Sequence, residues 1–544
     1  MQSGYKKILS NILGEIPLTA EFYFQLRNKR EPGTRYSLKN IQARLPQMVA
    51  DIEKYKVKAK KPKKILVFTS LHYWIEEAAT IAMYFAAKGQ QVTFGYLPYA
   101  DWQNEINKFD LRRQDLYTKK VFENTSKLMK LVSFLPIYPS YKPIPEELQQ
   151  IIETVSAFDT QYTLQVEDFD PESPLYKMRL DRNERFARLF YTWIKNNPQD
   201  QIIIPNGTIQ EMGVAYRIAK WLKIPVATYE FGEQRKRIWI AQDREVMRQE
   251  TDELWEVRRN IPTNAEEINK LREMFVARQR ADIWENFTRR WQKGDRIGTE
   301  QIRTELNLDE RPIVLLATNV LGDSLTLGRQ TFSRNMAEWL ERTVQYFVER
   351  TDAQLVIRVH PGEQLTHGAS MVDVVKTLLP TLPPHIHLVT PTSSVNSYDL
   401  VDVASVGLVY TTTMGLEMAM SGIPVVVAGQ THYRGRGFTI DPDTWVNYYK
   451  MLGGLLDDPE RMKLDEERRK AAWNYAHSFF FEYPRPFPWH LVKMWDDYDK
   501  RPFSYLLSEE GQKEYAESFD YLAGEKINWQ KILADKIQRS ESNE

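Results

Sequence analysis

Three consecutive threonines stand where a predicted strand gives way to a predicted helix. The strand is expected over Val406–Tyr410 and the helix over Leu416–Met420. Between them come three hydroxyl side chains and a glycine: Thr411, Thr412, Thr413 and Gly415. The first backbone N–H groups of a helix lack partners within it, and together with the helix dipole they favour an anion. The segment therefore predicts a phosphate or diphosphate site, in which the hydroxyls donate and Gly415 lets the ligand approach the backbone.

A carboxylate in the first turn of this helix has two interpretations. Glu417 suits the positive end of the helix dipole and could belong to an ordinary helix cap that binds nothing. It could instead accept hydrogen bonds from the hydroxyls of a ribose. The sequence leaves both open.

A histidine follows another predicted strand in the same half of the chain. The strand covers Ala353–Val359 and runs directly into His360, Pro361, Gly362 and Glu363. An imidazole N–H can donate to a phosphate and stabilise the charge on a departing nucleotide. Alone, such a histidine could simply pack at the end of its strand. With the threonine turn downstream, the functional interpretation is favoured.

The elements that must position these residues alternate as strand, helix, strand. Continuous apolar runs such as ILVFT at 65–69 and IVLLAT at 313–318 are typical of strands buried on both faces of a parallel sheet. Similar runs recur in both halves, each followed by a helical pattern. The predicted fold class is α/β, with two Rossmann-like doubly wound domains facing each other across a cleft, and with helical insertions. Ligands in such sheets bind beyond the carboxyl ends of the strands.

Four segments are expected along the chain. Residues 1–62 form a helical lead-in, and residues 63–300 the first Rossmann-like domain, with a helical insertion near 100–195. Residues 311–475 form the second such domain. Residues 476–544 form a helical segment that crosses back to the first domain.

Composition narrows the class of protein. The 544 residues carry 73 Lys+Arg and 73 Asp+Glu, so there is no global basic field for nucleic acid. The absence of cysteine excludes disulfides, thiolate metal sites and cysteine nucleophiles. No metal motif such as H-E-x-x-H is found, so no metal site is predicted. No stretch reaches the roughly 18 apolar residues needed to span a bilayer, and a cytoplasmic protein is expected.

Two segments could touch a membrane surface. One is an amphipathic helix at Tyr5–Ile16, whose alternative is an ordinary docking helix. The other is the aromatic run Phe479–Trp489, which is expected to cross back to the first domain and could otherwise lie at a bilayer interface.

Two stretches resemble the bacterial capsule polysaccharide biosynthesis family, which includes Kdo transferases of the GT-B fold. They are RVHPGE at 358–363 and YTTTMGLEMAMSGIPVVVAGQTHYRGRGFT at 410–439. The stretch 202–233, with its Asn-Gly turn and its E-x-G, is similar to the first half of that family. The remaining residues match by architecture alone.

The resemblance implies roles for the residues already noted. The second domain would bind a nucleotide-sugar donor, with His360, Pro361 and Glu363 and the turn Thr411–Thr413 near the phosphates. Gly415 lies in that turn, Glu417 would lie near the ribose or base, and a loop containing Tyr433, Gly435 and Gly437 would lie beside the donor. GT-B enzymes usually work without metal, so no cofactor beyond this co-substrate is expected.

The first domain would hold the acceptor and the general base. Such a base must reach the acceptor hydroxyl. Four side chains just after strands or at the start of a helix are candidates: His72, Glu211, Glu230 and Glu233. Each has a structural alternative, since His72 could pack against its aromatic neighbours and Glu211 could be a helix-terminal charge. Retaining chemistry would need no such base.

The predicted function is transfer of a sugar from a nucleotide donor to a glycan or lipid-linked glycan in surface polysaccharide synthesis. One alternative keeps the fold but moves a phosphoryl-polyol from a CDP-polyol. Another is a non-catalytic module that binds glycan or acts as a scaffold. A lipid-linked acceptor would bring peripheral contact with the inner face of the membrane. Oligomeric state is left open, because a neutral surface says nothing about symmetry.

Overall fold

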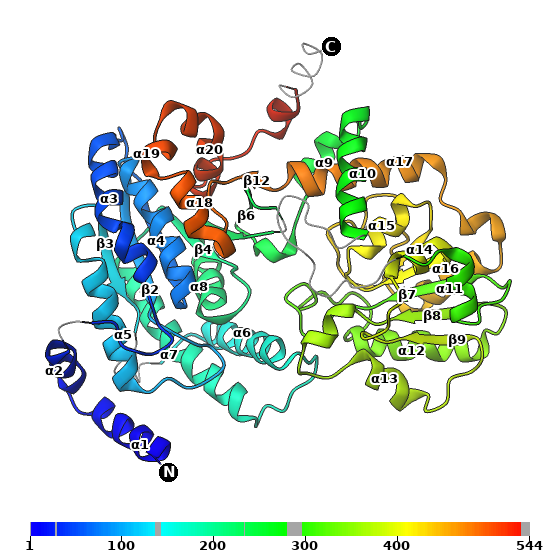
Figure 1. Ribbon diagram of the computed structural model, residues 1–544, viewed down its shortest axis with the longest axis horizontal. Helices are drawn as coiled ribbons and strands as arrows, with labels where there is room; N and C mark the ends of the chain where they lie inside the picture. The colour runs from blue at the N-terminus through cyan, green and yellow to red at the C-terminus, as the bar shows by residue number, and fades with distance from the viewer. Residues whose placement is uncertain (1, 28–29, 136–142, 233, 280–295, 535–544) are drawn as a thin grey trace. The chain divides into compact units, whose positions relative to one another are not determined.

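The computed structural model describes residues 2–27, 30–135, 143–232, 234–279 and 296–534 (Figure 1). The chain forms two compact units. Unit 1 contains Met1–Thr160, Asp170–Gln249 and Pro484–Ile527, and unit 2 contains Gln161–Phe169, Glu250–Tyr483 and Asn528–Glu544.

Unit 1 is built on a seven-stranded sheet in the order β12-β6-β5-β4-β1-β2-β3. Its strands are β1 (Lys64–Ser70), β2 (Gln91–Leu97), β3 (Met129–Ser133), β4 (Gln201–Pro205), β5 (Val226–Glu230), β6 (Arg237–Gln242) and β12 (Arg485–Pro486). The first five are parallel, and β6 and β12 add antiparallel pairings at one edge. Because β4 lies beside β1, the strand order reverses between them, which marks a doubly wound sheet with its switch point there.

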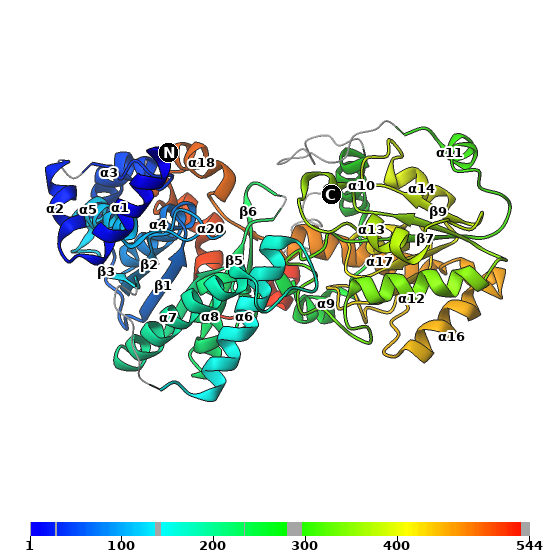
Figure 2. The same ribbon diagram turned by 90° about the horizontal axis from the view of Figure 1, so that it is seen from below.

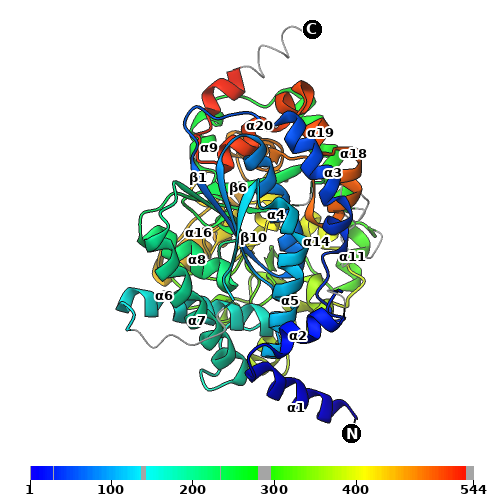
Figure 3. The same cartoon turned by 90° about the vertical axis from the view of Figure 1, so that its left-hand side faces the viewer.

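Helices cover both faces of this sheet (Figure 3). One face carries α4 (His72–Ala87) and α5 (Lys108–Val121), and the other carries α7 (Pro174–Asn196) and α8 (Gln210–Trp221). Right-handed crossovers place helices in this way when the strand order reverses. The insertion between β3 and β4 is α6 (Glu146–Leu164) followed by α7.

The two ends of unit 1 add further helices. The amino-terminal ones are α1 (Gln2–Glu15), α2 (Thr19–Leu26) and α3 (Lys39–Tyr55). After the chain returns at Pro484 come α18 (Met494–Lys500), α19 (Phe503–Leu506) and α20 (Glu509–Leu522). Among the described residues, no helix combines the length and apolarity that crossing a bilayer requires.

Unit 2 has a five-stranded, all-parallel sheet in the order β11-β10-β7-β8-β9. Its strands are β7 (Ile313–Ala317), β8 (Gln354–Arg358), β9 (Ile386–Val389), β10 (Val406–Val409) and β11 (Val425–Val427). Here the order reverses between β7 and β10. Figure 2 shows α12 (Met336–Glu349) and α14 (Ser397–Val403) on opposite sides of the sheet.

The remaining helices of unit 2 surround this sheet. They are α9 (Asp252–Arg258), α10 (Ala265–Gln279), α11 (Thr299–Glu305), α13 (Met371–Leu378), α15 (Met414–Met420), α16 (Trp445–Leu456) and α17 (Glu466–His477), which ends in a π-helical turn at Ser478–Glu482.

Two doubly wound, largely parallel sheets confirm the predicted α/β class. The units divide the chain differently from the predicted bounds. The segment 1–62 packs into unit 1, and unit 2 begins at Glu250 and also takes Gln161–Phe169 from the insertion. Their placement across a cleft stays a prediction. The aromatic run expected to cross over is inside the protein: Phe479, Phe487 and Trp489 are all buried, which speaks against interfacial contact.

A buried ion network ties the insertion of unit 1 to its sheet. Arg179 of α7 lies 2.9 Å from Asp159 of α6 and 3.4 Å from Glu211 of α8, and none of the three side chains is more than 1% exposed. Asp159 also accepts a hydrogen bond from the backbone N–H of Gln210. Removing one partner of such a network leaves a buried charge without compensation.

We therefore expect Arg179→Met to destabilise unit 1 by about 3–5 kcal/mol. Urea unfolding followed by calorimetry and far-UV circular dichroism would measure it, with Arg185→Met as the control. Arg185 lies on the same helix, pairs with Asp181 and is 38% exposed, so its loss should cost about 1 kcal/mol or less. Equal effects of the two substitutions would contradict a structural role for the network.

Candidate functional site

The carboxyl ends of the unit 2 strands gather five polar loops at one edge of the sheet. At the switch point the loop after β7 meets the loop after β10, because the backbone N–H of Thr411 donates to Asn319 Oδ1 at 3.1 Å. The loop after β8 is tied in by the backbone N–H of His360, which donates to Thr318 Oγ1 at 3.1 Å. His360 and Thr411 therefore lie at the same edge of the unit 2 sheet, as the sequence predicted.

A pocket of about 260 Å³ opens at this edge. Its lining is the end of β8, the start of the following turn and the hydroxyl-rich loop between β9 and α14: Arg358, Pro361, Gln364 and residues 391–397 (PTSSVNS). Apart from Arg358 the lining residues are uncharged. The pocket was not predicted from the sequence, although Pro361 was.

Arg358 is a buried cation without a carboxylate partner among the described residues. Its Nε donates to Ser397 Oγ at 3.0 Å and its Nη1 donates to the carbonyl of Thr390 at 2.7 Å. Arg358 is only 6% exposed, and this burial lowers the pKa of its guanidinium to about 10. Both partners are neutral, so the positive charge is available to an anionic or oxygen-rich ligand in the pocket.

The geometry of His360 fixes which ring nitrogen can donate. Its Nδ1 accepts a hydrogen bond of 3.0 Å from the backbone N–H of Gly362. In the neutral ring the proton must then be on Nε2. The side chain is half-buried. In that neutral tautomer Nε2–H is the donor of the ring, while Nδ1 shapes the Pro361 turn.

The threonine turn is built differently from an ordinary helix cap. Thr413 makes no capping hydrogen bond through its side chain. Thr411 Oγ1 is buried and has no hydrogen-bond partner among the described residues. A buried hydroxyl without a partner is costly, and its presence next to the switch point is compatible with a ligand that completes it.

A side chain at position 415 would clash with Tyr433, so packing alone explains the glycine. A Cβ atom at this position would lie 2.4 Å from the Tyr433 hydroxyl, which donates to the carbonyl of Thr412 at 2.6 Å. The space beside Gly415 is thus filled by Tyr433, a fully buried side chain. The expectation that this glycine admits a ligand was wrong, because a tyrosine packs there. Gly435 and Gly437 follow with φ of 75° and 90° and open space beside them.

The two predicted carboxylates of unit 2 have protein partners. Glu363 accepts from Ser370 Oγ at 2.7 Å and from the backbone N–H of Met371 at 3.2 Å, so it caps α13. Burial raises its pKa to about 7. Glu417 Oε1 pairs with Arg278 of α10 at 3.0 Å, whereas its buried Oε2 has no hydrogen-bond partner among the described residues. One oxygen of Glu417 is therefore without a protein partner among the described residues, while Glu363 is occupied.

In unit 1 three of the predicted residues end neighbouring strands. His72 follows β1, Asn206 follows β4 and Glu230 ends β5. Asn206 has φ of 60° and donates through Nδ2 to Glu230 Oε2 at 3.2 Å, which confirms the predicted Asn-Gly turn and joins two of these loops. The His72 ring packs edge-on against Tyr36 and Tyr73, and burial lowers its pKa.

Burial gives the carboxyls of this edge unusual proton affinities. It raises the pKa of Glu230 to about 7. Glu77 of α4, which was not predicted, is fully buried, accepts from the Tyr229 hydroxyl at 2.6 Å, and has its pKa raised to about 8 by burial and by the charge of Glu230. At neutral pH this edge therefore holds one carboxyl near its midpoint and one that keeps its proton.

The other two base candidates stand apart. Glu211 is 1% exposed and pairs with Arg179 in the network described above, a position that suits a structural role. Glu233 lies outside the described residues.

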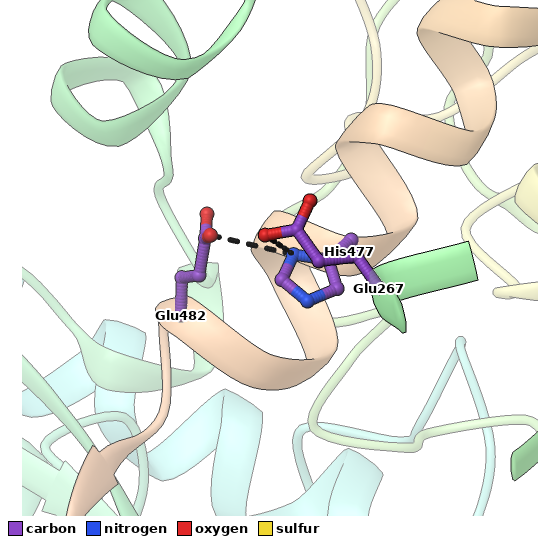
Figure 4. A group of neighbouring side chains, drawn as sticks. All are labelled: Glu267, His477 and Glu482. Carbon is purple, nitrogen blue, oxygen red and sulfur yellow. Dashed lines mark ion pairs between the residues drawn. The ribbon is translucent and has the colours of Figure 1, made fainter. Parts of the chain in front are cut away.

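A third cluster tests whether the described residues could hold a metal. Glu267, His477 and Glu482 place their ligand atoms within 4.8 Å of one another (Figure 4). Arg258 Nη2, however, lies 2.6 Å from Glu267 Oε2, and its Nε lies 3.3 Å from Glu482 Oε2. A guanidinium already compensates both carboxylates, so the cluster is better described as a buried ion network of unit 2.

Comparison with known proteins finds similar solved structures and one matching family. Many solved structures resemble the chain at low identity, among them the following two. The "Thermosulfurimonas dismutans KpsC, beta Kdo 2,4 transferase" is 14% identical with a TM-score of 0.33, covering 54% of this chain and 83% of its own. The UDP-GlcNAc 2-epimerase from Neisseria meningitidis is 12% identical with a TM-score of 0.25, covering 77% and 100%. At these values they say nothing about the reaction, and no curated protein matches.

The family match falls on the part of the chain that carries the unit 2 edge. Residues 265–450 match the model described as "Capsule polysaccharide biosynthesis protein". This range contains Arg358, His360 and the whole threonine turn. The predicted resemblance of this chain to the capsule polysaccharide biosynthesis family is thereby confirmed over residues 265–450.

Proposed function

We propose that the protein transfers a sugar from a nucleotide-sugar donor, bound at the unit 2 edge, to a glycan or lipid-linked glycan in surface polysaccharide synthesis. One observation carries the proposal: the buried Arg358 lines a pocket without a carboxylate to neutralise it. The family match over the same residues supports the sugar-transfer chemistry.

The chemistry of the step follows from charge. The bond between the anomeric carbon and the phosphate oxygen of the donor breaks, and the electron pair leaves with the nucleotide. A new bond forms from the acceptor oxygen to that carbon, and the acceptor proton goes to a base. In the proposal, His360 Nε2–H and the Thr411 hydroxyl face the departing phosphate, Arg358 holds oxygen atoms of the nucleotide, and Glu417 Oε2 accepts from the ribose.

Glu230 is our proposed base. A base works best when its pKa lies near the working pH, and burial brings Glu230 to about 7. His72 has a lowered pKa and remains the alternative. A CDP-polyol donor would use the same phosphate groups, and the mass of the product made from each donor separates the two reactions.

The first prediction concerns donor binding. Arg358→Met should weaken nucleotide binding by about 10–100-fold, since a hydrogen bond to a charged group contributes about 1.5–3 kcal/mol. Calorimetric titration with CMP, CDP, UDP and GDP would identify the nucleotide and measure the loss. Arg311→Met is the control, because Arg311 pairs with Asp309 on the surface of the same unit. The proposal fails if no nucleotide binds the wild type, or if both variants bind alike.

The second prediction separates the two nitrogens of His360. Asparagine can reproduce the Nδ1 acceptor for Gly362, and glutamine can reproduce the Nε2 donor. We expect His360→Asn to lower turnover by about 10²–10³-fold with the fold intact, as for the loss of a transition-state donor. His360→Gln should retain more activity. The reverse order in steady-state rates would mean that the histidine acts only by shaping its turn.

The third prediction uses pH. If Glu230 is the base, kcat/KM should rise with pH through about 7, because only the deprotonated carboxylate accepts a proton. Glu230→Gln should remove this limb and lower the rate by about 10²–10⁴-fold. Glu77→Gln is the matched control: Glu77 is protonated at neutral pH, so an amide should leave the limb in place. A limb well below pH 6.5 that survives Glu230→Gln would assign the base to His72.

A further inference from the structure

The amino-terminal helices of unit 1 expose an apolar face that the rest of the unit leaves uncovered. We define the N-terminal apolar face as Leu9, Ile12, Ile16, Leu18, Phe22 and Leu26. The last three are 72%, 66% and 64% exposed, values rare for side chains of this size. Exposed apolar residues gathered in this way mark an interaction surface.

Helical spacing puts these side chains on one side of each helix. Leu9 and Ile12 of α1, with Ile16 just after it, are three and four residues apart, and Phe22 and Leu26 of α2 are four apart. Leu18, the residue before α2, is the most exposed of the set. The opposite sides face the protein. Ala20 and Phe24 of α2 are buried.

Packing on α5 fixes which way the helices face (Figure 3). A Cβ atom on Gly14 of α1 would lie 2.7 Å from the backbone nitrogen of Phe109. The ring of Tyr23 meets Phe109 edge-on at 5.5 Å and carries the guanidinium of Arg113 above it. These contacts anchor both helices, so the outward side is set by the fold rather than by chance.

The charges near this face leave a positive excess. Its acidic neighbours are all paired: Glu15 with Lys108 at 2.7 Å, Glu21 with Arg112, and Glu31 with Lys39 at 2.8 Å. Arg27, Arg30 and Arg35, by contrast, are exposed, and among the described residues no carboxylate pairs with them. Outward apolar side chains beside uncompensated cations are the combination that binds an anionic lipid surface.

We propose that α1 and α2 lie in the headgroup region of an anionic phospholipid bilayer, with the N-terminal apolar face inserted and Arg27, Arg30 and Arg35 on the lipid phosphates. This binding does not require the proposed function, since no donor or acceptor takes part.

The helices that carry the N-terminal apolar face pack on α5, close to the strand-end edge of unit 1. Helix α5 begins at Lys108, directly after the loop that leaves the carboxyl end of β2, so its first turns lie at the strand-end edge that also holds His72. Tyr36, one residue after Arg35, packs against the His72 ring at 6.1 Å. If the proposed function holds, bound lipid would bring a lipid-linked acceptor to the edge that carries the base.

The test is flotation of the full-length protein with vesicles of phosphatidylcholine, alone or with phosphatidylglycerol. The wild type should float with the anionic vesicles and much less with the neutral ones. The triple variant Leu18→Gln, Phe22→Gln, Leu26→Gln should reduce the bound fraction by about tenfold or more, because interfacial binding scales with buried apolar area. Arg27→Gln, Arg30→Gln, Arg35→Gln should abolish the preference for phosphatidylglycerol and its sensitivity to salt.

The control replaces equally exposed apolar side chains elsewhere: Val446→Gln and Val492→Gln, which are 75% and 67% exposed, should bind vesicles like the wild type. Nucleotide titration of every variant should match the wild type, so failure here is distinct from failure of the proposed function. Failure of the wild type to float, or equal flotation of the triple variant, would overturn the proposal. So would light scattering that shows a wild-type dimer and a monomeric triple variant, which would assign the face to a second copy of the chain.

Discussion

An uncompensated buried cation is the constraint on which the unit 2 site depends. Taking a guanidinium out of water costs several kcal/mol unless a negative charge meets it. Within the described part of the chain, Arg358 donates to a serine hydroxyl and a backbone carbonyl and pairs with no carboxylate, and burial lowers its pKa. A chain selected for stability alone would place a carboxylate or an apolar residue there. The arrangement becomes favourable when a ligand supplies the missing negative charge or oxygen atoms, and the pocket beside Arg358 gives that ligand a place.

The two units differ in the polar groups that they hold at their strand ends: a cation and a hydroxyl in unit 2, and carboxyls in unit 1. At the unit 2 edge, a cation and the hydroxyl of Thr411 lack an acceptor-rich partner. At the unit 1 edge, burial raises the pKa of Glu230 to about 7 and that of Glu77 to about 8, so at neutral pH Glu230 is the carboxyl that can take up a proton. A departing nucleotide needs the first environment and an acceptor hydroxyl needs the second. Both follow from parallel strands, whose carboxyl ends collect polar loops at one edge.

The sequence predicted what depends on local pattern and missed what depends on distant contacts. Apolar runs revealed the strands around Ile65 and Ile313. Positions just after predicted strands gave His72, which follows the strand around Ile65, and His360, which follows the strand at Ala353–Val359. Arg358 was overlooked as a site residue because alternation along a strand does not say which face holds a pocket. Gly415 was assigned to ligand approach from its place in the threonine turn, but Tyr433, eighteen positions later, fills the space beside it. Glu77 sits within an apolar helical pattern, and only its contact with Tyr229 reveals it.

The amino-terminal helices also expose groups without a partner among the described residues, namely apolar side chains and unpaired arginines. Leu18, Phe22 and Leu26 are mostly exposed, so burial within unit 1 does not account for their apolar character. Their neighbours Glu15 and Glu21 are neutralised by lysine and arginine of α5, which leaves the arginines after α2 as the uncompensated charges. An apolar surface with a positive margin lacks an apolar, negatively charged partner, and an anionic bilayer is both. In the two proposals the pocket at Arg358 takes a nucleotide and the carboxyls near Tyr229 take the proton of an acceptor, whereas this surface takes an anionic bilayer whether or not that reaction occurs.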